Sequence, residues 1–470
     1  MRTFSELTFQ VASFIALPRS TFTQVRAALA VLLTLAFVPA AAARPVAIRG
    51  ADPEAYTLDL RYAERGPGQL SGSERIEFVN RGPAPLRRVW LRLWANGPDR
   101  CAPRRIQVEI DAPATAGAER VRCSALEVRL GAPVGPGATG AISLRFRVTV
   151  RRAADRFGRV RGTVLLGNVI PVLAVRDQRG LHLEPYSDMG ESFYSLAARW
   201  DAVLRLPERL RAATTGTVLS EATAGGERVL QVSSAQARDF ALAVGRLRVV
   251  QAAQGRVRVR VFRGPRVPGA RGSLRVARRA LRLLGRRLGP YDSRELDVVL
   301  FRGGIGAGIG MEYPELVFSI PSAEVIAHEV AHQWWYALVG NNQYREPWLD
   351  ESFAQYSQER LHPRSNPCRP RRPYALVAAP RRHIRLDSTM GLFERASPNA
   401  IGEVVYAAGS CALQRLERDI GRNRMTAVLR RLQTRFRHGV MTRSDVLAAI
   451  RRVAPRYRLN RWLRIAHLAP

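Results

Sequence analysis

IPSAEVIAHEVAHQWWYALVGNNQYREPWLDESFAQY, residues 320–356, decides the fold of this chain. The stretch predicts two helices joined by a short loop. Pro321 suits the first turn of the first helix, and Gly340 with Asn341 closes that helix. Pro347 opens the second helix. The first helix is apolar on most sides, which predicts that it is buried in a core.

His328, Glu329 and His332 in this stretch form the pattern H-E-x-x-H. Histidines four residues apart project from one helical face, which is the spacing of two zinc ligands. Glu329 lies beside that pair, where a carboxylate can act on water. Glu351, in the first turn of the second helix, can supply the third ligand. The alternative is a buried helix with two hydrogen-bonded histidines, but a divalent cation satisfies the histidines and the acidic residues together.

HEVAHQWWYALVG followed by PWLDESFAQY resembles the gluzincin aminopeptidases, the family of aminopeptidase N and leukotriene hydrolase. In that family the third zinc ligand is a glutamate, and eighteen residues separate it from the second histidine. Glu351 has this spacing from His332. Two further elements resemble family motifs: Gly310-Met311-Glu312 matches G-x-M-E-N, and residues 405–409 (VYAAG) match V-Y-x-x-G.

The resemblance implies a zinc-dependent peptidase with one Zn²⁺ per chain. His328, His332 and Glu351 are the implied metal ligands. Glu329 is the implied general base, which takes a proton from water and later delivers one to the leaving amine. Tyr406 is the implied donor to the developing oxyanion.

Gly310, Met311 and Glu312 are the substrate-binding residues that the resemblance implies. The family's glutamate at the Glu312 position binds the free α-amine of the substrate, so the resemblance favours an aminopeptidase. Glu312 is expected on an edge strand, alongside which an extended peptide can add. Asp350 stands where the family commonly has Asn and is expected to orient a metal ligand without being catalytic.

Two alternatives remain open. Tyr313 replaces the Asn of the family motif, and the segment from Glu312 to His328 is short. Both features lie on the amine side of the site, so a zinc endopeptidase remains an alternative. The other alternative is a non-catalytic envelope binding or assembly protein that retains a peptidase scaffold.

The pattern of elements predicts an α+β fold. An antiparallel β domain is expected over residues 46–248, because hydrophobic residues alternate at 56–62 and 142–150. A thermolysin-like zinc peptidase domain with a short helical C-terminus is expected over residues 249–470. The resemblance implies a short form that lacks the large C-terminal helical domain of many relatives.

Within the second domain, residues 273–288 predict an amphipathic helix with leucines on one face and arginines on the other. We favour a scaffold helix whose basic face is solvated over a membrane-binding helix. Glycines at 303–310 are not a dinucleotide fingerprint, since the following residues 311–320 predict an edge strand instead of a helix.

Residues 1–43 are expected to be a signal peptide with a mis-annotated extension. Arg26, an apolar run and small residues before Arg44 have the form of a bacterial secretory signal at residues 25–43. The expected location is the cell envelope or the extracellular space, with a mature N-terminus near Arg44. Residues 1–24 are the expected extension, ahead of an initiator at Val25.

Four cysteines in an exported chain permit two disulfides, with three possible pairings. We favour Cys101 with Cys123 and Cys368 with Cys411, because each pair stays within one expected domain. The four lack the close spacing of a zinc-thiolate site.

The net charge of the 470-residue chain is +35, and all 74 of its basic residues are arginine. Exclusive use of arginine indicates a GC-rich coding bias. The charge still favours non-specific attraction to anionic envelope polymers or membrane. No specific nucleic-acid partner is expected, because the charges are scattered and no reader motif is present. The expected partner is a peptide substrate, and the oligomeric state is not predicted.

Overall fold

The computed structural model of the chain describes residues 46–468, apart from 65, 67, 99–100, 102–103, 151–155, 303–309, 363–367, 369–383 and 398. These residues belong to one compact unit. The expected signal at 25–43 and most of the glycine run lie outside the described residues. No helix in the described part is long and apolar enough to cross a membrane.

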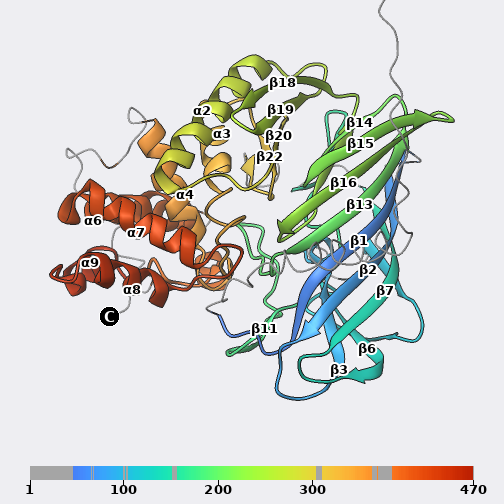
Figure 1. Cartoon of the computed structure of the whole chain (residues 1–470), viewed down its shortest axis with the longest axis horizontal. Helices are drawn as coiled ribbons and strands as arrows, with labels where there is room; N and C mark the ends of the chain where they lie inside the picture. The colour runs from blue at the N-terminus through green and yellow to red at the C-terminus, as the bar shows by residue number, and fades with distance from the viewer. Residues whose placement is uncertain are drawn as a thin grey trace, which may run out of the picture. The chain divides into compact units, whose positions relative to one another are not determined.

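Alternating hydrophobic residues build the large N-terminal sheet, whose strand order is β15-β16-β13-β1-β2-β7-β4 (Figure 1). Its centre is β1 (Ala51–Ala63) next to β2 (Gln69–Asn80), which are antiparallel. β1 also pairs with β13 (Ala198–Pro207) in parallel, while the other pairs of this sheet are antiparallel. The expected antiparallel sheet therefore contains one parallel pair. Its other strands are β4 (Ile106–Ile110), β7 (Thr139–Thr149), β15 (Thr217–Ala224) and β16 (Glu227–Ala237).

Two four-stranded sheets and a short hairpin complete this β part, in the orders β10-β3-β6-β5, β14-β17-β9-β8 and β11-β12. Their bounds are β3 (Leu86–Arg92), β5 (Thr115–Arg120), β6 (Ala125–Val134), β8 (Phe157–Val160), β9 (Thr163–Leu166), β10 (Val172–Leu173), β11 (Arg176–Asp177), β12 (Gly180–Leu181), β14 (Arg211–Thr214) and β17 (Leu242–Gly245). A 3₁₀ turn, η1, covers Trp94–Asn96.

A five-stranded sheet with order β18-β19-β20-β22-β21 opens the second half. Its strands are β18 (Arg248–Gln254), β19 (Val257–Arg263), β20 (Glu295–Leu300), β21 (Gly310–Met311) and β22 (Leu316–Ser319). The expected single strand at 311–320 is therefore wrong. A turn stabilised by a backbone bond from Leu316 to the Tyr313 carbonyl splits it into β21, at the sheet edge, and β22.

The helix α2 (Ala270–Leu288) confirms the expected amphipathic helix and ends at Gly289, whose φ of 122° suits glycine. It packs against the helix α3 and the strands β18 and β19. The other helices are α3 (Ala323–Ala331), α4 (Trp348–Leu361), α5 (Met390–Ala396), α6 (Gly409–Ile420), α7 (Arg422–Arg435), α8 (Arg443–Val453) and α9 (Leu459–Ile465), with a π-helical segment η4 (Gly402–Ala408) before α6.

The expected first helix is too long at both ends. Ser322 caps α3, with its hydroxyl accepting from the Val325 amide at 3.4 Å, so Pro321 precedes the helix. After His332 the chain turns, and the Trp335 carbonyl accepts from the His332 ring at 2.9 Å instead of from the next helical turn. Val339 donates to Trp334 instead. The early end of α3 thus supplies an acceptor for a histidine.

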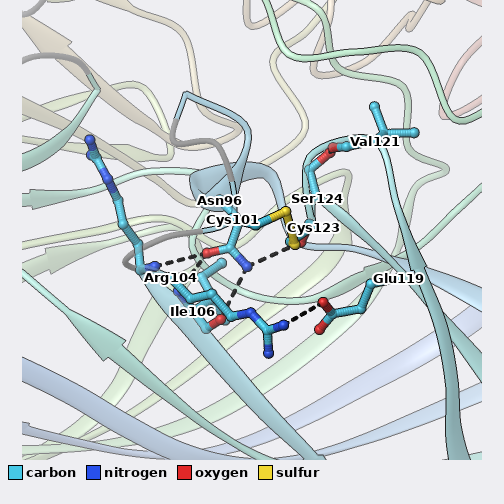
Figure 2. Close-up of a disulfide and its surroundings, with 9 residues drawn as sticks. Asn96, Cys101, Arg104, Ile106, Glu119, Val121, Cys123 and Ser124 are labelled. Carbon is cyan, nitrogen blue, oxygen red and sulfur yellow. Dashed lines mark hydrogen bonds and ion pairs between the residues drawn. A yellow bond between two sulfur atoms is a disulfide. The ribbon is translucent and has the colours of Figure 1, made fainter.

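The Cys101–Cys123 disulfide confirms the first expected pairing (Figure 2). Asn96 fixes the same region, because its amide donates to the carbonyls of Ile106 and Cys123 at 3.1 and 3.2 Å. Its side-chain oxygen accepts from the amides of Arg105 and Ile106. The whole Asn96 amide is thereby satisfied in a buried position.

The second disulfide joins Cys368 to Cys411 and confirms the other expected pairing. Cys411 lies on α6. This bridge ties the segment after α4 to the C-terminal helices.

Two hydrophobic cores follow this division of the chain. One fills the β part and continues to Met311 of β21 and Phe318 of β22. The other lies among the helices and the faces of β19 and β20 that they cover. The α+β class is confirmed, and the exact boundary at 248/249 remains a prediction.

Candidate active site

The α3 helix brings the two histidines of the motif together, with their Nε2 atoms 3.0 Å apart. His332 is 1% exposed. Its Nδ1 lies 2.9 Å from the Trp335 carbonyl, which can only accept, so Nδ1 carries the proton. When Nε2 is deprotonated, as metal binding requires, its lone pair is available to the metal, and the carbonyl fixes the ring plane.

Glu351, in the first turn of α4, completes a triangle of donor atoms. Its Oε2 lies 3.1 Å from Nε2 of His328 and 3.3 Å from Nε2 of His332. Ligands about 2.0 to 2.1 Å from a tetrahedral zinc ion are about 3.3 Å apart, so the three atoms match one face of such a site. The residues fit zinc in number, chemistry and spacing.

Local interactions hold the third ligand ionised. Burial alone would raise the pKa of Glu351, but the two histidines lower that pKa well below its usual range. The Tyr406 ring stacks on His328, with centroids 5.7 Å apart, next to the same carboxylate. Burial raises the pKa of Tyr406 well above its usual value, so this phenol stays a donor. The predicted oxyanion donor therefore lies beside the metal-binding atoms.

Glu329 lies on the same helix, 5% exposed, between the metal-binding atoms and the edge strand β21. A β-carbon on Gly310 would lie 2.9 Å from Cγ of Glu329 and closer still to its carboxylate. Only glycine leaves room for the base at this point. Burial raises the pKa of Glu329 well above its usual value, which suits a group that must accept and return a proton.

Glu312 follows β21 directly and is 2% exposed. Its carboxylate forms one acidic group with Glu191 and Glu351, whose oxygens all lie within 4.8 Å of one another. Burial raises the pKa of Glu191 well above its usual value, and Glu312 raises it further. The buried Glu312 and the partly buried Glu191, adjacent to each other and next to a metal ligand, can bind a cation such as an ammonium group.

Sequence analysis did not place Glu191 in the site. It lies more than a hundred residues before the metal ligands, in the β part of the chain. No spacing rule connects Glu191 to His328. The fold brings it there, together with Arg156, whose guanidinium lies 3.6 Å from Glu191.

The side chain of Met311 does not join the site. It is 3% exposed and packs in the core of the β part, because alternate residues of a strand face opposite sides. Gly310 and Glu312 therefore face the metal-binding residues. The predicted substrate contact of Met311 is limited to its backbone.

Tyr313, the departure from the family motif, also faces away from the site. Its hydroxyl donates to the side-chain oxygen of Asn168 at 2.8 Å, and its ring is fully buried. A β-carbon on Gly167 would collide with this phenol, so glycine there makes the space. The substitution alters the packing behind the site and leaves the Glu312 carboxylate in place.

A cavity of about 660 Å³ joins these groups. Arg156 is the only arginine or lysine among the described residues that line it. The lining combines metal-binding residues, acids and a few apolar groups, namely Arg156, Asp188, Met189, Gly190, Glu191, Gly310, Glu312, Glu324, Val325, His328, Glu329, His332, Glu351, Gln355, Gln358, Asn399, Ile401, Gly402, Glu403 and Tyr406. Its size and acidity fit a short cationic segment such as a peptide N-terminus.

The chain is similar to known proteins in the region of this site. A model of the peptidase family M1 domain matches residues 320–462. Over 81 residues the chain is 37% identical to aminopeptidase B of Homo sapiens. The matched stretch is 16% of this chain and 12% of that protein. The chain is 35% identical to leukotriene A-4 hydrolase of Xenopus laevis, also over 81 residues, or 16% of this chain and 13% of that protein. The chain thus spans about an eighth of the length of these curated relatives.

Solved structures share the whole fold. An M1 zinc metallopeptidase from Deinococcus radiodurans has a TM-score of 0.63 and 20% identity, covering 90% of this chain and 95% of that one. A mutant of the Deinococcus radiodurans enzyme bound to a Tyr-Ser-Ala substrate has a TM-score of 0.66 and 20% identity, and the match covers 90% of this chain and 96% of that one. The expected order of a β domain and a zinc peptidase domain is confirmed. Residues 320–462 of the chain thus match the peptidase family M1 domain, and zinc is the cofactor that this match implies.

Proposed function

We propose that the chain is an exported zinc aminopeptidase that removes N-terminal residues from short peptides. The observation that carries this proposal is the position of the buried Glu312 and the partly buried Glu191 beside the zinc-binding triangle. A free α-ammonium group held there places the first peptide bond next to the metal. A blocked N-terminus cannot donate a charged hydrogen bond to either carboxylate, and the loss of such a bond weakens binding.

When bound, zinc supplies Lewis-acid activation of water and polarisation of the scissile carbonyl. Glu329 takes the proton of the attacking water and delivers a proton to the leaving amine. Tyr406 donates its hydroxyl hydrogen to the oxyanion that develops. Gly310 keeps the edge strand close to Glu329, so the extended substrate backbone and the base meet at one place.

The Tyr-Ser-Ala complex of the Deinococcus radiodurans enzyme supports a choice of short peptides as substrates. The direct test compares amino-acyl substrates that carry a free N-terminus with their N-acetylated forms. We expect zinc-dependent cleavage of the free forms and loss of most of that rate on acetylation. Glu312→Ala should lower kcat/KM for free-amine substrates by about 10- to 100-fold, the effect of losing a charged hydrogen bond, while zinc stays bound.

Equal cleavage of free and blocked substrates would overturn the aminopeptidase assignment in favour of an endopeptidase. Absence of any chelator-sensitive cleavage would favour a non-catalytic binding protein instead.

Export is the second part of the proposal. The basic, apolar and small-residue order at 25–43 supports it, and so do two disulfides, which form in oxidising compartments. The test is N-terminal sequencing of protein from the envelope or the medium, where we expect a start near Arg44. Reduced cytosolic protein that still carries Met1 or Val25 would refute export.

A further inference from the structure

Gln343 lies between the proposed amine-binding carboxylate and the metal ligands. It belongs to the loop that joins α3 to α4, and its side chain is fully buried. One side-chain atom approaches Glu312 Oε1 at 3.1 Å and Asp350 Oδ2 at 2.7 Å. Both neighbours are carboxylate oxygens, so that atom is the amide nitrogen, and each of its two hydrogens bonds one acid.

This amide connects the two halves of the site. The other carboxylate oxygen of Asp350 accepts a hydrogen bond from the backbone amide of Glu351 at 2.9 Å. The Asn341 side chain donates to that oxygen as well. A chain of hydrogen bonds therefore runs from Glu312 through Gln343 and Asp350 to the third metal ligand. A movement of Gln343 would change the distance between the amine site and the metal site.

The backbone of the same residue contacts the other acidic group. The Gln343 amide donates to the Phe193 carbonyl at 3.1 Å, two residues after Glu191. Its neighbours fix the loop to the hairpin region of the β part. Asn342 lies 3.2 Å from the His182 ring, and Arg345 pairs with Glu184 at 2.5 Å. Gln343 thus has little freedom to reorient.

From this geometry we infer that Gln343 is a positioning residue for amine capture. Its amide sets the Glu312 carboxylate at a fixed distance from the metal ligands, so that one substrate spans both. It does not line the described part of the cavity, so it acts through Glu312 without touching substrate. Two buried carboxylates without a donor between them repel and move apart. The inference rests on the proposed aminopeptidase function.

The test replaces Gln343 by methionine, which keeps the length of the side chain and removes both donors. For a free-amine substrate we expect KM to rise about tenfold or more, as for the loss of a hydrogen bond to a charged group. We expect kcat to stay within about threefold and the zinc content to stay at one per chain, because Glu329 and the ligands are untouched. The slow rate on the acetylated substrate should not change.

Gln433→Met is the matched control. Gln433 is also buried and donates to the Trp334 carbonyl at 3.0 Å, outside the site. Gln433→Met should lower the stability by about as much as Gln343→Met does, with no change in KM. An unchanged KM in Gln343→Met would overturn the inference, and so would an equal KM rise in Gln433→Met.

A double variant separates positioning from support of the fold. In Gln343→Glu with Asp350→Asn, the new amide at 350 donates to the new carboxylate at 343, so the link between these positions persists. Glu312 still loses its donor. We expect the thermal stability lost in Gln343→Glu to return while KM stays raised. Recovery of the wild-type KM would show that only the hydrogen bond between positions 343 and 350 matters. It would overturn the inference that Gln343 positions Glu312.

The two proposals fail in different ways. If the wild-type protein does not distinguish free from acetylated substrates, the aminopeptidase function fails. If it does distinguish them and Gln343→Met retains the wild-type KM, only the positioning role fails.

Discussion

Replacing Gly310 by alanine should disable the base without removing the metal. The added β-carbon would lie 2.9 Å from Cγ of Glu329, and closer to its carboxylate, where ordinary contacts begin at about 3.4 Å. The side chain must therefore withdraw by about 0.5 Å at Cγ, and by more than about 1 Å at the carboxylate. A misplacement of about 1 Å in a reacting group costs about 10²-fold in rate.

We therefore expect kcat of Gly310→Ala to fall about 100-fold, with zinc content unchanged, because the three heavy atoms nearest the new methyl group all belong to Glu329 and not to a metal ligand. The assay is steady-state cleavage of a fluorogenic amino-acyl substrate, with zinc measured on the same sample. Gly272→Ala on α2 is the control, since nothing lies within 4 Å of its added carbon. Wild-type kcat in Gly310→Ala would refute the close approach of β21 to Glu329, and loss of zinc would refute the separation of base and ligands.

Three further predictions concern the β part and its contacts. Glu74 is buried, no hydrogen bond to its carboxylate oxygens is found among the described residues, and burial raises its pKa well above the usual value. The folded state then holds the Glu74 proton more tightly than the unfolded state, so the free energy of unfolding falls as the pH rises towards the pKa of Glu74 in the folded protein. Glu74→Gln should therefore be more stable than wild type at pH 8 but not at pH 4, as measured by denaturant unfolding. Arg238, 2% exposed, donates to the carbonyls of Tyr336, Ser195 and Gly439, so Arg238→Met should cost about 3 kcal/mol or more, and a loss below about 1 kcal/mol would contradict this. Replacing Cys101 and Cys123 by serine should cost about 2 to 4 kcal/mol in thermal or chemical unfolding, whereas equal stability with and without reductant would argue against the bridge.

The metal site was predictable because its signal is local. Two histidines four residues apart on a helix share one face whatever the rest of the fold, so their convergence follows from helix geometry. Glu351 needed only the start of the next helix, which Pro347 marked. The two disulfides followed from the assumption that each pair stays within one domain.

The rest of the site depends on contacts that no spacing rule describes. Glu191 reaches the cavity through the packing of the β part, and Gln343 through the course of a loop. The end of α3 was misplaced for a related reason. Helix propensity favours continuation to Gly340, but the chain turns after His332, where the Trp335 carbonyl accepts the His332 ring proton.

Tyr313, which replaces the Asn of the family motif, also has an orientation that the sequence did not predict. Sequence alone placed the change on the amine side of the site. The structure turns the phenol towards Asn168, into space that Gly167 leaves, so the Glu312 position is unaffected. Which way a side chain points at a turn between two short strands depends on space that distant residues provide.

The central claim is that this chain is a zinc aminopeptidase whose base is Glu329, and one measurement tests it most directly. Wild type and Glu329→Gln are compared for zinc content and for chelator-sensitive cleavage of a free amino-acyl substrate and its acetylated form. The account predicts one zinc per chain in both proteins, cleavage of the free form by wild type, and a loss of at least about 10²-fold in Glu329→Gln. Full activity of Glu329→Gln, or equal cleavage of the free and acetylated substrates by wild type, would contradict it.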